Sequence, residues 1–168
     1  MKILFILPEL PYPLTTGVRV KCHSILLAAS GQHSCDIVSL GGEDIISAEQ
    51  LISECLPNAS LLKILSPYKG WKLVYVKLIT LIKRQPTFFA RYSSRKIHST
   101  ISRVSAEGYD LIFIESFALA SYVSDVGGLP CVISITDALS IAYSHAAEES
   151  NNFLTSEMKR TSGDATKR

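Results

Sequence analysis

The side chains best placed to bind a ligand lie in one segment near the amino terminus. After the apolar run 3–7, the chain reads Pro8-Glu9-Leu10-Pro11-Tyr12-Pro13-Leu14-Thr15-Thr16-Gly17-Val18-Arg19, and a helical pattern then begins. Thr16 offers a helix-capping hydroxyl, and Gly17 permits a tight turn or a close approach of the backbone to a ligand. The free N–H groups of a helix start favour a phosphate, with which Arg19 could pair. The segment predicts an anion site, with a stiff proline-rich connector as the alternative.

Two carboxylates follow later apolar runs. Glu115 comes directly after the run 111–114, and Asp137 follows the run 131–135. In open parallel sheets, ligands bind at the carboxyl ends of the strands, so both side chains fall where a ligand would lie. Glu115 could accept a hydrogen bond from a ligand hydroxyl, and Asp137 could orient or deprotonate one. Each could instead cap the helix that follows it, because acidic side chains stabilise helix starts.

Positive charge is concentrated in the middle of the chain. Residues 63–103 contain ten Lys or Arg and no Asp or Glu, although the whole chain, with 17 bases and 15 acids, has a formal charge of only +2. Within this stretch, Trp71–Lys83 reads as a helix with apolar side chains on one side and lysines on the other. Such a helix can lie on an anionic bilayer, here the inner face of the plasma membrane. A helix that faces the domain core is the alternative. Nucleic acid is not expected, because no motif that reads it is present.

The composition is that of a folded protein with room for one domain. The chain has 168 residues, of which 47% are hydrophobic and 19% charged. Its four cysteines are scattered and form no C-x-x-C pair, which predicts free thiols in a reducing, cytoplasmic compartment. No apolar window reaches the roughly 18 to 20 residues of a membrane span, and the first residues do not form a signal peptide.

Neither a metal nor a cofactor is expected. The dinucleotide fingerprint G-x-G-x-x-G is absent, which disfavours a nicotinamide or flavin enzyme. His145 lies about one helical turn from Glu148 and Glu149, but no third ligand can be identified, so a solvated helix face is the better interpretation.

Apolar runs alternate with helical patterns along most of the chain. Strands are expected at 3–7, 37–40, 61–65, 111–114 and 131–135, and helices at 20–29, 45–56, 71–83, 93–107, 117–126 and 139–149. Apolar runs without polar alternation are typical of parallel strands that are covered on both faces. The pattern therefore predicts a Rossmann-like α/β domain with a doubly wound sheet of about five parallel strands. We expect this domain to span residues 1–150, with a polar, poorly ordered tail at 151–168.

Several short motifs resemble, in their order and spacing, those of the family 4 glycosyltransferases. The opening is similar in Lys2-Ile3-Leu4-Phe5-Ile6-Leu7-Pro8, in Pro11-Tyr12-Pro13 and in Thr16-Gly17-Val18-Arg19. Two later segments are similar as well, namely Arg84-Gln85-Pro86 with Arg91-Tyr92-Ser93-Ser94, and Gly108-Tyr109-Asp110-Leu111-Ile112-Phe113-Ile114-Glu115. The resemblance covers residues 1 to about 150 and implies the amino-terminal, acceptor-side domain of a GT-B enzyme.

The resemblance implies a retaining enzyme that moves a sugar from a nucleotide-sugar donor to a glycan or lipid-linked acceptor, as in cell-surface polysaccharide synthesis. Thr16, Gly17 and Arg19 would then meet the donor phosphates. Asp137 would contact the acceptor or the reacting sugar as the catalytic residue, and Glu115 would help to bind substrate. Val18 stands where the family carries a second glycine. No second Rossmann-like domain follows, so we expect a truncated acceptor half that transfers no sugar by itself.

Two other functions stay open on the sequence alone. The chain could be a non-catalytic α/β binding module that attaches to a membrane through Trp71–Lys83. It could also be an inactive remnant of a longer enzyme.

Overall fold

The computed structural model describes residues 1–41, 45–82 and 87–135. Within this part of the chain, Met1–Ser134 form one compact unit. The helix expected at 139–149, the tail expected at 151–168 and the predicted domain boundary at 150 lie outside the described residues.

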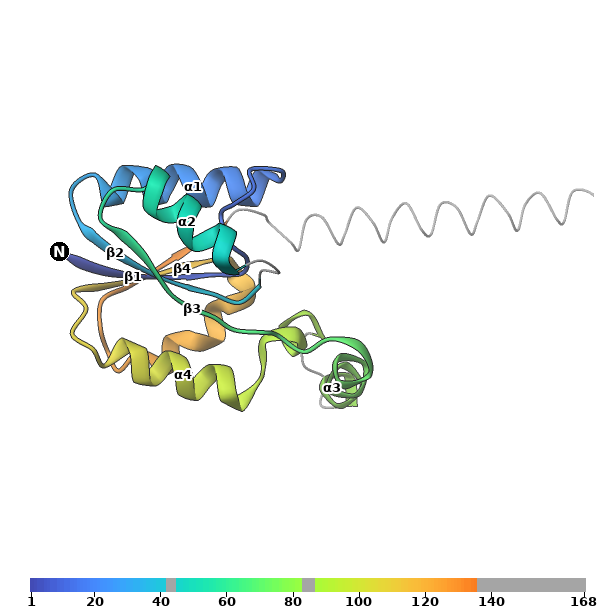
Figure 1. The fold of residues 1–168 in the computed structure, drawn as a ribbon. Helices are drawn as coiled ribbons and strands as arrows, with labels where there is room; N and C mark the ends of the chain where they lie inside the picture. The colour runs from blue at the N-terminus through green and yellow to red at the C-terminus, as the bar shows by residue number, and fades with distance from the viewer. Residues whose placement is uncertain (42–44, 83–86, 136–168) are drawn as a thin grey trace, which may run out of the picture. The chain divides into compact units, whose positions relative to one another are not determined.

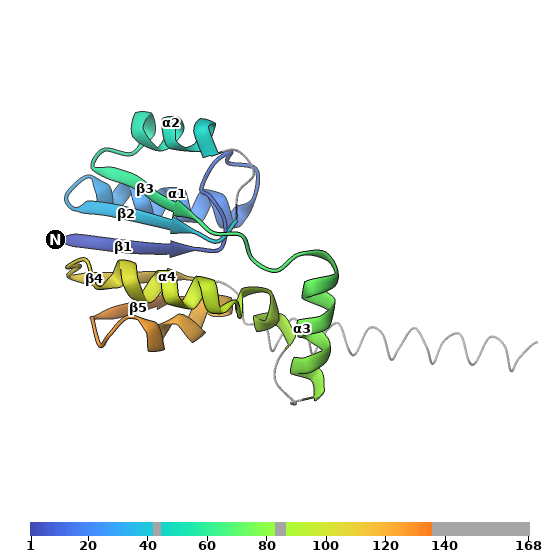
Figure 2. The ribbon, with the colours of Figure 1, turned by 60° about the horizontal axis from the view of Figure 1, so that its bottom comes forward.

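Five strands form one all-parallel sheet, as the sequence predicts. They are β1 (Lys2–Leu7), β2 (Ser34–Ser39), β3 (Ala59–Ile64), β4 (Leu111–Glu115) and β5 (Cys131–Ser134). Their order across the sheet is β3-β2-β1-β4-β5, and every neighbouring pair is parallel. The chain winds outward from β1 to β3 and then returns to place β4 on the other side of β1 (Figures 1 and 2). The point where the strand order reverses therefore lies between β1 and β4, and ligands of open α/β sheets bind beside such a point.

Helices cover both faces of the sheet, which confirms the Rossmann-like α/β class. α1 (Gly17–Ser30) and α2 (Ile45–Cys55) lie on one face, and α4 (Arg95–Ser105) and η2 (Phe117–Asp125) lie on the other (Figure 1). α3 (Gly70–Ile82) and the short 3-10 helix η1 (Thr87–Tyr92) stand between β3 and α4 in the chain and pack on each other. No helix in the described ranges is long and apolar enough to cross a membrane.

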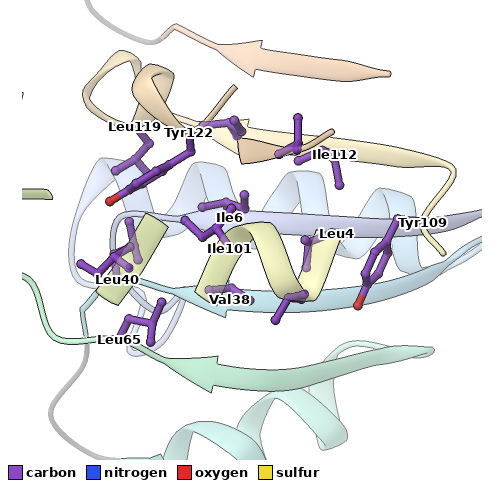
Figure 3. Close-up of a cluster of buried hydrophobic side chains, with 14 of the residues drawn as sticks. Leu4, Ile6, Val38, Leu40, Leu65, Ile101, Tyr109, Ile112, Leu119 and Tyr122 are labelled. Atoms are coloured by element: carbon purple, nitrogen blue, oxygen red, sulfur yellow. The ribbon is translucent and has the colours of Figure 1, made fainter. Parts of the chain in front are cut away.

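The two faces of the sheet bury separate hydrophobic clusters, because successive strand residues point to opposite sides. Ile3, Phe5 and Leu7 of β1 pack with α1 and α2. Leu4 and Ile6 of the same strand pack on the other face with α4 and η2. Figure 3 shows this second cluster, in which Ile101 of α4 and Tyr122 of η2 meet side chains of the central strands. The helices on both faces therefore pack on side chains of β1, the central strand of the sheet.

Two of the expected helices differ from the structure in form. The helix expected at 117–126 is the 3-10 helix Phe117–Asp125 rather than an α-helix: the Leu119 N–H donates to the Ser116 carbonyl three residues back in its first turn. Gly127 and Gly128, both at positive φ, follow its end. The helix expected from residue 20 begins at Gly17. Gly17 is therefore the first helical residue instead of part of a turn.

Candidate functional site

The candidate site is built at the carboxyl edge of the sheet, beginning with the amino terminus of α1. Thr16 is the cap residue, and its hydroxyl accepts a hydrogen bond from the Arg19 backbone N–H at 3.3 Å. Gly17 is exposed, and a Cβ placed on it would meet no atom within 4 Å. The first N–H groups of any helix have no partner inside the helix and carry its positive dipole end. The start of α1 therefore offers an open, electropositive surface.

An ion pair holds the β1–α1 loop in place. The Glu9 carboxylate accepts from Arg19 Nε at 2.8 Å and lies 2.8 Å from the second guanidinium nitrogen. The same guanidinium donates to the Pro13 carbonyl and to the Thr15 hydroxyl, each at 3.3 Å. Arg19, which the sequence suggested as a phosphate partner, thus binds its own loop in this structure. It lies two residues after Gly17, in the first turn of α1, and its guanidinium is already bound by Glu9 and the loop.

The loop is also fixed against the neighbouring strand. The Leu10 N–H donates to the Gly41 carbonyl at 3.2 Å, just beyond the end of β2. A Cβ at Gly41 would lie 3.0 Å from the Pro8 carbonyl oxygen, so any larger residue there would push the loop away. The close approach explains the glycine.

A long-range polar cluster joins α1 to the ends of β4 and β5. Lys21 Nζ donates to Glu115 Oε1 at 2.9 Å and to Ser134 Oγ at 2.7 Å. The Glu115 side chain is only 1% exposed, whereas Lys21 is 29% exposed. Burial raises the pKa of the adjacent Cys22 thiol to about 12, with the Glu115 charge adding to the increase and the Lys21 charge opposing it. Glu115 is therefore a buried acceptor held by a cation, and the side chain that caps the next helix is that of Ser116.

Ser116 follows Glu115 in a strained conformation. Its φ is 90° and its ψ is 134°, a region that side chains other than glycine rarely adopt. Its hydroxyl caps η2 by accepting from the Ala118 N–H at 3.2 Å, and its own N–H donates to the Ser134 carbonyl at 2.9 Å. Backbone strain of this kind collects at functional sites, where the surrounding structure holds it in place.

Replacement of Ser116 separates the strain from the cap. Ser116→Ala keeps the strain and loses the cap, so it should lower the free energy of unfolding by about 1 kcal/mol. Ser116→Gly also loses the cap but relieves a strain of about 1 kcal/mol or more, so it should match or exceed the native stability. Urea unfolding of both variants checks this order. If Ser116→Gly is no more stable than Ser116→Ala, the backbone at Ser116 is not strained.

The predicted site residues are brought together only in part. Thr16, Gly17 and Arg19 share the first turn of α1, and Glu115 is tied to the same helix through Lys21. Asp137, the predicted catalytic residue, lies outside the described residues, as do His145, Glu148 and Glu149. Sequence reasoning missed Lys21, for which a signal existed. Lys21 lies three residues after Val18 and four before Ile25, both packed on the core, so it is a cation on the covered face of α1.

Other polar clusters in the described ranges are internal to the fold. Asp36 in β2 accepts from the Tyr109 hydroxyl at 2.9 Å and from Ser60, and lies 3.6 Å from Lys2 Nζ. These residues are at the amino edge of the sheet, away from the strand ends that bind ligands. Among the residues that the structure describes, no group of three or more His, Cys, Asp or Glu could hold a metal ion.

Comparison with known proteins gives distant structural likenesses. No protein-family model and no curated protein matches the chain. Among solved structures, the chain is similar to the C-terminal domain of a hydrogenase from Pyrococcus furiosus, with 12% identity, a TM-score of 0.47, and coverage of 80% of this chain and 90% of that one. It is also similar to Phytolacca americana UGT2, solved with UDP-2-fluoro-glucose and pterostilbene, with 13% identity, a TM-score of 0.49, and coverage of 81% of this chain but 30% of that one. Likenesses this distant carry no argument about chemistry, which must rest on the residues of this chain.

Proposed function

We propose that this chain provides the amino-terminal, acceptor-side domain of a retaining GT-B glycosyltransferase related to family 4. Its reaction moves a sugar from a nucleotide-sugar donor to a glycan or lipid-linked acceptor in cell-surface polysaccharide synthesis. The motifs at 2–19 and 108–115 support the proposal. The observation that carries it is the polar carboxyl edge, where the open start of α1 and the Lys21–Glu115–Ser134 cluster lie beside the point of strand reversal.

The proposal gives each residue a role that its chemistry allows. The donor diphosphate lies at the N–H groups of Thr16 and Gly17, where the helix dipole favours negative charge. Arg19 leaves Glu9 to pair with the same phosphate oxygens. Glu115 is buried and acts through Lys21, whose ammonium it holds at the ends of β4 and β5. Asp137 orients or deprotonates the acceptor hydroxyl. The proposed reaction needs no cofactor besides the donor.

The open surroundings of Gly17 allow a clean test of the diphosphate site. Because Gly17 has ordinary helical φ and free space around it, both Gly17→Glu and Gly17→Gln should fold. A carboxylate at a helix start stabilises the helix but repels a phosphate there, whereas glutamine adds the same bulk without charge. In NMR titrations with UDP and UDP-glucose, we expect shifts in the amides of residues 16–19. Gly17→Glu should weaken binding by about tenfold or more relative to Gly17→Gln, a change of about 1.4 kcal/mol.

Two results would refute this assignment. If UDP, other nucleoside diphosphates and their sugars all leave the amides of 16–19 unshifted at millimolar concentration, no donor phosphate binds at α1. If Gly17→Glu and Gly17→Gln weaken binding equally, bulk rather than charge is responsible.

A further inference from the structure

Helix α3 exposes large apolar side chains on one side. Trp71, Val74, Tyr75, Leu78, Leu81 and Ile82 are each 55–75% exposed, and α3 contains no buried residue. These six side chains therefore do not face the domain core in this structure. Exposed apolar patches of this kind mark contact surfaces in soluble proteins.

The exposed side chains form a continuous stripe. At about 100° per residue, these six residues fall within one third of the helix circumference. The partly covered side chains, Leu73, Val76, Ile79 and Thr80, fall on the opposite side, and α3 packs on η1. The helix thus uses one apolar face to attach to its own domain and leaves a second one, the outer stripe, without cover among the described residues.

Positive charge surrounds the outer stripe. Lys72 and Lys77 are exposed at its two flanks, and Lys69 precedes the helix. The whole stretch 63–103 has ten bases and no acid. No Lys or Arg of this stretch takes part in an ion pair between described residues. The stripe therefore lies in a field that attracts an anionic surface.

We propose that α3 docks on the anionic surface of a lipid bilayer, lying in its interface with the outer stripe toward the acyl chains. Tryptophan and tyrosine are the side chains that settle at the headgroup level, and flanking lysines reach lipid phosphates while their stems stay apolar. A second copy of the chain fits the stripe poorly, because its own basic stretch, which contains no acid, would repel the basic stretch of the first copy. The proposal does not depend on the proposed sugar transfer.

The chain contains its own probe for this docking. Trp71 is the only tryptophan of the 168 residues and lies in the outer stripe, so its fluorescence reports the stripe alone. With vesicles of phosphatidylcholine containing about 30% phosphatidylglycerol, we expect a blue shift of Trp71 emission and co-sedimentation of the full chain. Both signals should be much weaker with phosphatidylcholine alone and should fall as salt is added.

Paired variants identify the surface and the charge. Leu78→Glu with Ile82→Glu places two carboxylates in the outer stripe and should abolish binding. Leu27→Glu, at an exposed leucine of α1, is the matched control and should bind like the native chain. Lys72→Gln with Lys77→Gln should weaken binding roughly 10- to 30-fold, since each lysine near an anionic surface contributes a factor of about five. All substituted side chains are exposed, and circular dichroism verifies the fold.

The proposal is wrong if the anionic vesicles neither shift the Trp71 emission nor sediment the chain. It is also wrong if the Leu78→Glu, Ile82→Glu variant binds vesicles like the native chain, because another surface would then be responsible. Emission that is already blue-shifted without lipid would show that protein covers the stripe, either another copy, detected by sedimentation equilibrium, or the chain itself. Equal binding to both kinds of vesicle would refute the role of the basic stretch.

Discussion

Replacement of Lys21 by methionine is expected to lower the free energy of unfolding by roughly 3 kcal/mol. Methionine keeps most of the apolar stem but removes the ammonium that lies 2.9 Å from Glu115 Oε1 and 2.7 Å from Ser134 Oγ. The Glu115 carboxylate, 1% exposed, then loses its cation without gaining access to water. The cost of such a buried charge exceeds that of breaking a surface pair, for which about 1 kcal/mol is the usual upper range. Urea unfolding followed by circular dichroism measures the loss.

Two further variants decide whether the buried charge is the cause. Glu115→Gln in the Lys21→Met background removes the charge while keeping the side-chain shape, so the double variant should recover most of the lost stability. Lys96→Met removes an exposed lysine from α4 and should change the stability by no more than about 0.5 kcal/mol. A Lys21→Met variant as stable as Lys96→Met, or a double variant no better than the single one, would exclude a stabilising Lys21–Glu115 pair.

The sheet was predictable because its signal is local and strong. Ile3–Leu7 and Leu111–Ile114 have no polar residue within them, which is typical of a strand covered on both faces. β3 gave a weaker signal because it is an edge strand, where Leu62 and Lys63 remain exposed. The 3-10 helix η1 was not anticipated, since such short helices depend on their neighbours rather than on apolar periodicity.

The candidate site was predictable only where chain neighbours build it. Thr16, Gly17 and Arg19 are close together because they begin one helix, and the rule for strand ends placed Glu115 at the same edge. The Lys21–Glu115 contact joins residues 94 positions apart. The spacing of Lys21 to Val18 and Ile25 places it on the covered face of α1, but which strand residue it meets depends on how α1 crosses the sheet, which no local pattern determines. The pairing of Arg19 with Glu9 was likewise hidden, because the conformation of the proline-rich loop decides it.

A loss of stability at alkaline pH should follow from the buried thiols and phenols. Burial raises the pKa of Cys22 and of Tyr12 to about 12 and that of Cys35 to about 11. The pKa values of Tyr109 and Tyr122 are raised further, again mainly by burial. In the unfolded chain, the pKa is about 8.5 for cysteine and about 10 for tyrosine. Between those values and the folded pKa values, the unfolded chain has lost protons that the native state still holds.

Proton linkage gives the direction in which the free energy of unfolding changes with pH. Because the unfolded state binds fewer protons above about pH 8.5, the free energy of unfolding must fall as the pH rises, by up to about 1.4 kcal/mol per pH unit for each group. Cys22 and Cys35, which are both buried, lie on the α1–α2 side of the sheet and act first. Urea midpoints measured under reducing conditions from neutral pH to about pH 10.5 should decline steeply, while stability stays level below about pH 8 with respect to these groups.

Cysteine variants separate this effect from general alkaline unfolding. The double variant Cys22→Ala, Cys35→Ala begins less stable because it leaves small cavities, but its stability should fall less steeply between about pH 9 and pH 10.5. Cys55→Ala is a partial control: Cys55 is exposed, but its hydrogen bond with Tyr12 adds to the raised pKa of that phenol, so its replacement should flatten the decline less than the double variant does. If the double variant and the control decline in parallel, the two thiols do not hold their protons in the folded state. If the decline is clearly less steep for the double variant than for the control, ionisation of Cys22 and Cys35 limits the stability of this fold at alkaline pH. Both thiols belong to the packed face of the sheet that also positions α1 and the start of the candidate site.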